Sequence, residues 1–510
     1  MTTATYLPLV ALVVLPLLGG GLVALLPRGN DELARRVALG VSLVTLVIAV
    51  LVAVAYEPGA GAFQLTTSWS WIPAWGVRFA LGVDGISLVL ILMTAVLVPV
   101  CILAGWRDAD EAMGSVRAYF AWILVLEALV VGVFAATDVF LFYVLFEAML
   151  IPMYFLIGRY GGARRQYAAV KFFLYSLLGG LAMLAALVGV YVLSAEQYGS
   201  GTFDYAALVG LDIAPEAQKW LFLGFFLAFA IKAPLWPLHT WLPDAASEAP
   251  PSSAVLLVGV LDKVGTFGML RLCLPLFPDA SRYFTPMVVV LSVIGILYGA
   301  LVAIGQTDLK RLIAYTSVSH FGFIALGIFA LTSQGQSGAT LYMVNHGFSI
   351  AALFLVVGFM ATRRGSRAVD AFGGVQKVAP VLAATFLIAG LSSLALPGLS
   401  SFVSEFLVLA GTFTRYPIAA AIATLGIVLA ALYILLMYQR TMTGPVPDEV
   451  AWMPDLSRRE RVAIVPVLAI IVALGFFPQV ALDVINPSVD QTMAVVGATD
   501  PAPAIAEPGK

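Results

Sequence analysis

Long, nearly uninterrupted apolar runs are the feature that most constrains how this chain can fold. The segment LVLILMTAVLVPVCILAG, residues 88–105, carries no charge at all. About 20 helical residues cross the hydrocarbon core of a bilayer, and each span satisfies its own backbone hydrogen bonds because no water is present there. Only 11% of the 510 residues are charged, whereas a soluble protein carries about 25%. The sequence therefore predicts an all-α protein that crosses a membrane many times.

We count fourteen such runs. We expect the first to be kept as a span rather than cleaved as a signal peptide, because no basic segment precedes it. The runs cover residues 5–27, 36–55, 79–105, 118–136, 138–158, 167–194, 219–247, 251–276, 286–304, 309–330, 338–361, 379–413, 417–440 and 461–478.

The distribution of basic residues gives the expected orientation. Lys and Arg gather in the cytoplasmic loops of membrane proteins. With the N-terminus outside, eighteen of the 27 basic residues fall in inside loops, six fall outside, and Lys171, Lys232 and Lys263 lie within spans. This bias predicts an even number of spans in a bacterial inner membrane, with both termini on the outer, periplasmic side.

Proline interrupts two of the spans. The first, FLAFAIKAPLWPLHTWLPDA at 226–245, contains Pro234, and the second, AGLSSLALPGLSSFVSEFL at 389–407, contains Pro397. Proline removes a backbone donor and clashes with the preceding turn. A break at membrane depth is tolerated only where it is buried in protein or lines a wet cavity. Broken helices in corresponding halves predict an inverted-repeat transporter architecture.

Ionisable residues inside the apolar runs are the candidate functional residues. Such a residue is expensive to bury in a membrane and is retained when function needs it. All three histidines of the chain belong to the set. The candidates are Glu127, Glu147, Lys171, Lys232, His239, Lys263, His320, His346 and Glu405.

The spacing of four candidates indicates a repeat. Glu147 precedes Lys232 by 85 residues, and His320 precedes Glu405 by the same 85. Each half thus carries one ionisable group on an unbroken span and another at a broken span, as two copies of a five-helix unit would. We divide the chain accordingly into three N-terminal spans (1–117), a first repeat of spans 4–8 (118–276), a second, inverted repeat of spans 9–13 (286–440), a loop and last span (441–486) and a loose tail (487–510) rich in Ala, Pro and Asp.

These residue types suit proton transfer. A lysine in apolar surroundings holds its proton less tightly, and a nearby glutamate strengthens that hold again. We expect Lys232 and Glu147 to form such a switch. Lys263 and the two histidines of the second half would relay the proton along the midplane, since histidine titrates near neutral pH. Glu405 would exchange the proton with the outside.

Three of the candidates have structural alternatives. Lys171 lies near the inside end of its span and could extend to the interface. His239 follows a helix break and could be a structural hydrogen-bonding group, while Glu127 could be a satisfied partner between helices. Near span ends, Asp84, Asp138 and Asp244 are expected to be caps or interface residues.

Several function classes are excluded. A net charge of −2 gives no basis for nucleic-acid binding. The two cysteines, Cys101 and Cys273, cannot supply the four ligands of an iron–sulfur cluster. No glycine-rich nucleotide-binding motif follows a predicted strand. The chain itself is therefore expected to hold neither nicotinamide nor ATP, and no metal.

Five strings resemble the antiporter-like subunits of respiratory complex I, the proton-pumping NADH:quinone oxidoreductase. They span most of the chain, and the second is highly specific. They are FLFYVLFEAMLIPMYFLIG at 140–158, FAIKAPLWPLHTWLPDAASEAPPSSAVLLVGVLDKVGTFGMLR at 229–271, DLKRLIAYTSVSHFGFIALG at 308–327, VNHGFSIAALF at 344–354 and LSSLALPGLSSFVSEFL at 391–407.

The resemblance implies roles for the candidates. The string that contains Glu405 resembles that of subunit M, the counterpart of mitochondrial subunit 4. In subunits L and N a lysine is expected at the place of this glutamate. Glu111 would match an auxiliary glutamate, and Ala246 departs from a histidine found in many relatives. The remaining matches are Glu147 and Lys232 to the essential pair, Lys263 to the central lysine, and His320 and His346 to the relay.

Members of this family contain no flavin, cluster or quinone, so the resemblance places NADH, FMN, iron–sulfur clusters and quinone in other subunits. It also implies subunits L and N as neighbours. We retain three alternatives. The chain could belong to a multisubunit sodium/proton antiporter, could be a quinone-binding redox enzyme in its own right, or could be an inert assembly scaffold.

Overall fold

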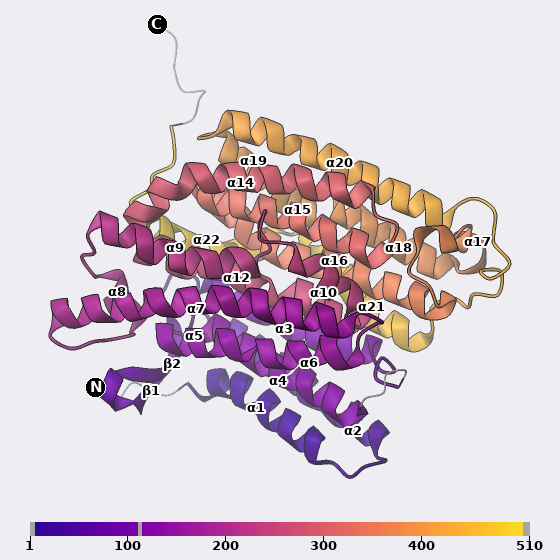
Figure 1. Ribbon diagram of the computed structural model, residues 1–510, viewed down its shortest axis with the longest axis horizontal. Coiled ribbons are helices and arrows are strands. Elements are labelled where there is room, and N and C mark those ends of the chain that lie inside the picture. Colours follow the sequence, from indigo (N-terminus) through magenta and orange to yellow (C-terminus); the bar gives the residue numbers. More distant parts are fainter. Residues whose placement is uncertain (1–5, 111–114, 503–510) are drawn as a thin grey trace, which may run out of the picture.

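The computed structural model describes residues 6–110 and 115–502. Its helices lie side by side along one direction and form a single bundle, with a small β-hairpin at one end (Figure 1). The prediction of a helical membrane protein is confirmed. Glu111, which we expected to match an auxiliary glutamate, lies outside the described residues.

The elements follow one another along the chain without a second domain of another class. The first half contains α1 Leu7–Leu25, α2 Asp31–Ala55, β1 Gln64–Ile72, η1 Pro73–Trp75, β2 Val77–Val83, α3 Gly85–Ala104, α4 Val116–Ala135, α5 Val139–Ala148, α6 Leu150–Tyr160, α7 Arg165–Tyr198, α8 Tyr205–Val209, α9 Pro215–Lys232, α10 Trp241–Glu248, α11 Pro251–Val255, η2 Leu256–Leu261, α12 Lys263–Gly268, η3 Met269–Cys273 and α13 Leu274–Leu276. The second half contains α14 Pro278–Ile304, α15 Leu309–Phe329, α16 Ser333–Arg364, η4 Val369–Ala371, α17 Val375–Val378, α18 Pro380–Ser393, α19 Ser400–Phe413, α20 Pro417–Met442, α21 Arg458–Phe476 and α22 Gln479–Val496.

Among the described residues, eleven helices are long and apolar enough to cross a membrane, or up to thirteen if each of two bent pairs is one span. Our count of fourteen is therefore not confirmed. The runs missing from the eleven are 219–247, 379–413 and 461–478. Helix α9 carries three charges in its 18 residues, α19 has only 14 residues, and α18 and α21 are counted only as parts of the two bent pairs.

The two predicted helix breaks are present. Helix α9 ends at Lys232, and α10 begins only at Trp241. Helix α18 ends at Ser393, and α19 begins at Ser400. In the second break Ala395 has a positive φ of 60°, which interrupts the helical backbone. Each break therefore leaves a functional candidate, Lys232 or Glu405, beside an irregular segment.

The buried span that follows α10 contains a feature that the sequence did not reveal. Residues Pro251–Leu276 are continuous in space, but η2 and η3 within them are π-helices. Stretches of π-helix are rare and occur frequently at functional sites. Lys263 is the first residue of α12 and is separated from η2 by Asp262 alone.

Two of our boundaries were wrong. Residues 79–83, which we placed in the third span, belong to β2, which pairs antiparallel with β1. The span begins at Gly85 because Asp84 caps it by accepting a hydrogen bond from the Ser87 amide at 2.8 Å. The tail expected to be loose after Pro487 is instead helical to Val496, since α22 lies against α3 and α16.

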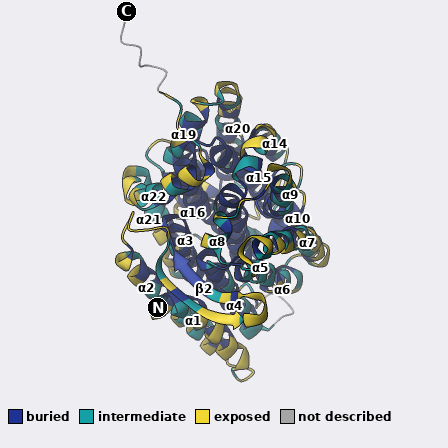
Figure 2. Ribbon diagram, turned by 90° about the vertical axis from the view of Figure 1, so that its left-hand side faces the viewer, coloured by how far each residue is buried: buried dark blue, intermediate teal, exposed yellow. Residues whose placement is uncertain are grey.

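Burial separates a central group of helices from a peripheral one (Figure 2). The apolar windows of Pro251–Leu276, α15 and α16 are 100% buried, whereas that of α2 is only 28% buried. Outer helices expose large apolar side chains, which suits a surface that faces lipid. Most of the candidate residues thus lie in the protected centre of the bundle.

Candidate functional site

Lys232 lies at the end of α9, where the first break begins. It is fully buried, and its Nζ donates to Ser176 Oγ on α7 at 3.3 Å. The ammonium also lies 4.9 Å from the centre of the Phe146 ring and 5.5 Å from that of Phe172. Aromatic faces attract a cation, so these rings stabilise the charge without removing its proton.

Glu147, on α5, lies close to this lysine without touching it. Its carboxylate occupies the space that the missing side chain of Gly180 leaves on α7, since a Cβ at that glycine would lie 1.8 Å from Glu147 Oε1. The same oxygen is buried and has no hydrogen-bond partner among the described residues. No ion pair of the described chain joins Glu147 to Lys232, although each charge lies within electrostatic range of the other. The two residues of the predicted pair are therefore neighbours that form no ion pair in this structure.

Lys263 is the centre of the second half of the site. It is fully buried, and its Nζ contacts the Val258 carbonyl oxygen and His346 Nδ1, both at 2.7 Å. Val258 lies within the π-helix η2, five residues before the lysine. The irregular turn therefore presents a carbonyl to the ammonium, and α16 presents an imidazole.

From His346 the polar contacts continue to the second helix break. The ring centres of His346 and His320 are 5.2 Å apart. His320 Nδ1 lies 3.1 Å from the Tyr342 hydroxyl, which donates to Glu405 Oε2 at 3.4 Å. Four side chains that we predicted to act together thus lie in succession. Tyr342 links His320 to Glu405, while His346 and His320 are neighbouring rings without a hydrogen bond, since His346 Nε2 has no partner among the described residues.

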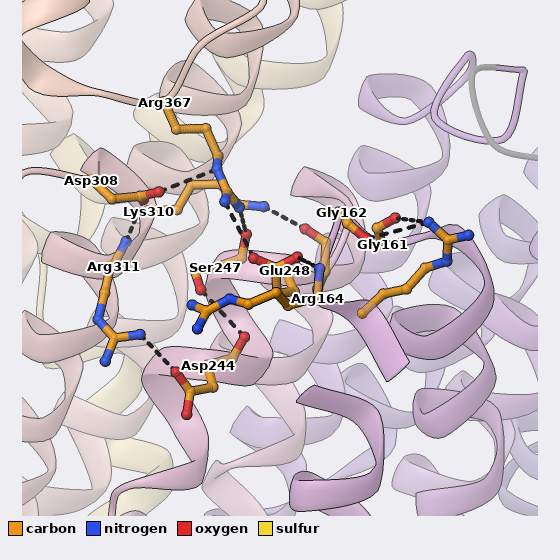
Figure 3. A network of polar contacts seen from close by, with 12 residues as sticks. Gly161, Gly162, Arg164, Asp244, Ser247, Glu248, Asp308, Lys310, Arg311 and Arg367 are labelled. Carbon is orange, nitrogen blue, oxygen red and sulfur yellow. Dashed lines mark hydrogen bonds and ion pairs between the residues drawn. The ribbon is translucent and has the colours of Figure 1, made fainter. Parts of the chain in front are cut away.

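A second polar cluster fastens α10, the helix after the first break, to the rest of the bundle (Figure 3). Asp244 pairs with Lys171 of α7 at 2.7 Å and with Arg311 of α15 at 2.6 Å. Glu248 accepts a hydrogen bond from the Arg164 amide at 2.9 Å and pairs with Arg367 at 3.2 Å. These contacts join the first half of the chain to the second.

Beside this cluster a cavity of about 860 Å³ opens among the basic loops. Asp108 lies at its wall, where burial raises the pKa of the carboxyl while hydrogen bonds from Ser252 and Tyr119 lower it in part. Three chain segments therefore meet at this wall. The charged residues of the lining are Arg107, Asp108, Arg159, Arg165, Glu248, Lys310, Arg363, Arg367, Arg459 and Glu460.

Known proteins share both the sequence and the fold. A family model described as NADH:quinone oxidoreductase/Mrp antiporter, TM, matches residues 136–430. NADH-quinone oxidoreductase subunit M of Mycobacterium tuberculosis (strain ATCC 25618 / H37Rv) is 52% identical over 97% of this chain and 95% of its own. The chain belongs to the NADH:quinone oxidoreductase/Mrp antiporter transmembrane family. The resemblance read from the five strings is thereby confirmed.

Two solved structures show how far the likeness of the fold extends. A chain of respiratory complex I from Thermus thermophilus with bound NADH has a TM-score of 0.88 and 33% identity, covering 96% of this chain and all of that one. A chain of the Mrp complex from Dietzia sp. DQ12-45-1b has a TM-score of 0.82 over 97% and 99% of the two chains. Its identity of 22% makes it a match of fold alone.

The three candidates that have structural alternatives, Lys171, His239 and Glu127, lie in different surroundings. Lys171, whose side chain is 20% exposed, pairs with Asp244 of α10 at 2.7 Å. His239 is buried beside the Tyr298 ring, with centres 5.0 Å apart, and neither ring nitrogen has a hydrogen-bond partner among the described residues. Glu127 is 1% exposed and likewise has no partner there. A satisfied structural role therefore fits neither His239 nor Glu127.

The three aspartates at span ends are caps or interface residues, as expected. Asp84 and Asp138 are caps, the latter accepting from the Leu141 amide at 2.9 Å. Asp244 is an interface residue that joins α7, α10 and α15. No cluster of three or more His, Cys, Asp and Glu in residues 6–110 and 115–502 could hold a metal ion.

The prediction missed polar residues that carry little or no charge. Tyr342 and Tyr433 both contact His320, the latter at 3.3 Å. A tyrosine in an apolar run gives no signal, because its ring is an ordinary core group. Unlike the tyrosines, Asp262 gives a clear signal in the sequence, because it is a carboxylate inside an apolar run. The sequence analysis named its neighbour Lys263 and did not name Asp262.

Proposed function

We propose that this chain is the proton-translocating antiporter-like subunit M of an NADH:quinone oxidoreductase. The observation that carries the proposal is the buried line from Lys263 through His346, His320 and Tyr342 to Glu405. Groups that exchange protons lie in succession where packing alone would favour apolar side chains. The names of the full-length relatives and the match to a complex I chain support the same function.

The mechanism follows from the positions of the charges. Lys232 keeps its proton when the Glu147 carboxylate approaches it and releases the proton when the carboxylate moves away. The observed separation of the two groups therefore favours release from Lys232. Lys263 accepts the proton and passes it through His346 and His320. Tyr342 then delivers it to Glu405 for release on the outer side.

In this proposal the redox chemistry belongs to other subunits. NADH, FMN, iron–sulfur clusters and quinone are bound there, and their reaction drives the movement of Glu147 relative to Lys232. The chain is part of an oxidoreductase without performing hydride or electron transfer itself. Subunits L and N would be its neighbours.

The location we propose is a bacterial inner membrane, with the basic loops inside and both termini outside. Support comes from the way these loops gather. Arg35 pairs with Asp110, and Arg363 binds Glu460 at 2.6 Å, so loops far apart in sequence meet at one end of the bundle. Such a concentration of positive charge is typical of the cytoplasmic side.

The competing function is a subunit of a sodium/proton antiporter. Its structural support is a likeness of fold at 22% identity. An antiporter subunit would work without NADH, whereas our proposal requires NADH oxidation to drive proton movement. Finding genes for NADH-oxidising subunits beside this one would decide in favour of the oxidoreductase, and their absence would decide in favour of the antiporter.

The test replaces Lys232 by alanine and Glu147 by glutamine in the intact membrane complex. We expect NADH-driven proton movement, followed by a pH-sensitive dye in vesicles, to fall at least about tenfold because the switch is lost. NADH oxidation by an artificial electron acceptor reports assembly and should not change. An assembled complex that pumps at the original rate with either variant would instead identify the chain as a scaffold.

A further inference from the structure

A buried aspartate beside the central lysine is left unused by the proton line. Asp262 is fully buried, and neither carboxylate oxygen has a hydrogen-bond partner among the described residues. Most buried polar groups in folded proteins do have a partner, and a carboxylate in a membrane interior is especially unfavourable. The residue therefore needs an explanation beyond packing.

The helix geometry shows which way Asp262 faces. It directly follows the π-helix η2, and Gly265 lies three residues later, on the same face of the helix. That face presses against the end of α9, because a Cβ at Gly265 would lie 2.5 Å from the Ala233 amide nitrogen and 2.6 Å from the Phe229 carbonyl oxygen. Ala233 is the residue directly after Lys232. Asp262 is therefore on the side of its helix that meets the lysine of the first half.

Lys263 faces elsewhere. Successive residues of a helix point about 100° apart around its axis. The ammonium of Lys263 accordingly reaches α16, where it contacts His346 at 2.7 Å. Two adjacent residues thus face two different helices, one in each half of the chain.

The position of Asp262 lies between the two buried lysines of the site. Asp262 directly precedes Lys263, and the face of its helix that carries Gly265 packs against Ala233, the residue after Lys232. No ion pair among the described residues holds it to either lysine. Asp262 is near both cations but bound to neither of them, as an intermediate carrier must be.

We propose that Asp262 carries the proton between the two halves, from Lys232 to Lys263. In the first step the Lys232 ammonium gives a proton to the Asp262 carboxylate, which leaves a neutral amine and a neutral carboxylic acid. In the second step the acid gives that proton to the neutral amine of Lys263, which restores the carboxylate. One proton and one positive charge move, and nothing else changes.

This proposal rests on the proposed function, because it supplies the link between the Glu147–Lys232 switch and the line that begins at Lys263. Without it, the two halves are joined by no polar side chain that the proton line already uses. The proposal also explains why a carboxylate remains at a place where it gains no hydrogen bond.

The experiment compares three substitutions at this position in the intact complex. Asp262→Asn keeps the shape and loses the exchangeable proton, Asp262→Leu is apolar, and Asp262→Glu keeps the acid. We expect NADH-driven proton movement to fall at least about tenfold with Asn and Leu and to be retained in large part with Glu. Ser292→Ala is the matched control, since Ser292 is also buried without a partner but lies on α14.

Several outcomes would overturn the proposal. One is full pumping with Asp262→Asn in vesicles where Lys232→Ala abolishes it, which would leave the proposed function intact. Another is equal loss with Glu and with Asn in assembled complexes, which would indicate a steric role. If neither Asn nor Leu allows assembly, the aspartate is structural and the proposal also fails. Pumping that survives Lys232→Ala would contradict the proposed function itself.

Discussion

Replacing Tyr342 by phenylalanine tests the proton line at its narrowest link. The hydroxyl lies 3.1 Å from His320 Nδ1 and 3.4 Å from Glu405 Oε2. No hydrogen bond among the described residues joins His320 directly to Glu405, so the Tyr342 hydroxyl is the group that lies within hydrogen-bonding distance of both. The substitution removes a single oxygen and keeps the ring in place.

The size of the effect follows from the burial of the carboxylate. Glu405 is 4% exposed, and the tyrosine hydroxyl is its one hydrogen-bond donor among the described residues. Leaving a buried acceptor without its partner costs about 1–3 kcal/mol. This cost falls on the ionised form that Glu405 must adopt after releasing its proton. Since about 1.36 kcal/mol corresponds to a factor of ten in rate, we expect proton movement to slow between about 5-fold and 150-fold.

The assay is NADH-driven acidification of vesicles that contain the intact complex. Tyr433→Phe is the matched control, because Tyr433 also contacts His320, at 3.3 Å, but is not hydrogen-bonded to Glu405. It should have a much smaller effect than Tyr342→Phe. Unchanged pumping with Tyr342→Phe, or equal losses with the two variants, would refute the assignment of the line through Tyr342.

Two further substitutions test the surroundings of the site. Gly180→Ala should displace the Glu147 carboxylate by about 1.6 Å, the shift needed to reach an ordinary contact, and should abolish pumping. Gly189→Ala on the same helix is the control, because its new methyl group meets only the flexible end of a leucine and should leave pumping intact. Equal vesicle acidification with the two variants would contradict this expectation. Asp244→Asn removes two ion pairs that are partly buried, so we expect the yield of assembled complex to fall, measured by native gel electrophoresis; an unchanged yield would show that these pairs do not hold α10.

The sequence candidates that the structure places in the buried centre of the bundle share one property, which is charge inside an apolar run. Lys232, His320 and Glu405 were visible because a charged group in a membrane span is rare whatever surrounds it. Proline in the same runs located the two breaks. These signals are local, so a single sequence is enough to read them.

The features that were missed depend on structure around the residue. Tyr342 acts through its hydroxyl, which joins two side chains from other helices, and no pattern along the chain reveals that placement. The π-helices on either side of Lys263 lie in a segment whose apolar window is 100% buried, and no pattern that we used in the sequence marked them. The β-hairpin was hidden because its second strand continues directly into an apolar helix.

The spacing of 85 residues predicted two equivalent pairs, but the structure makes them different. In one pair His320 and Glu405 are joined through Tyr342, while in the other Glu147 and Lys232 have no contact. A pump must not connect both sides of the membrane at once, because protons would then flow back through it. In our proposal the proton line of the second half is continuous from His320 to Glu405 in this state, so a proton can leave. The Glu147–Lys232 pair of the first half is apart in the same state, so no proton can enter through it. Asp262 lies at the boundary between the halves, so its protonation would decide when they communicate.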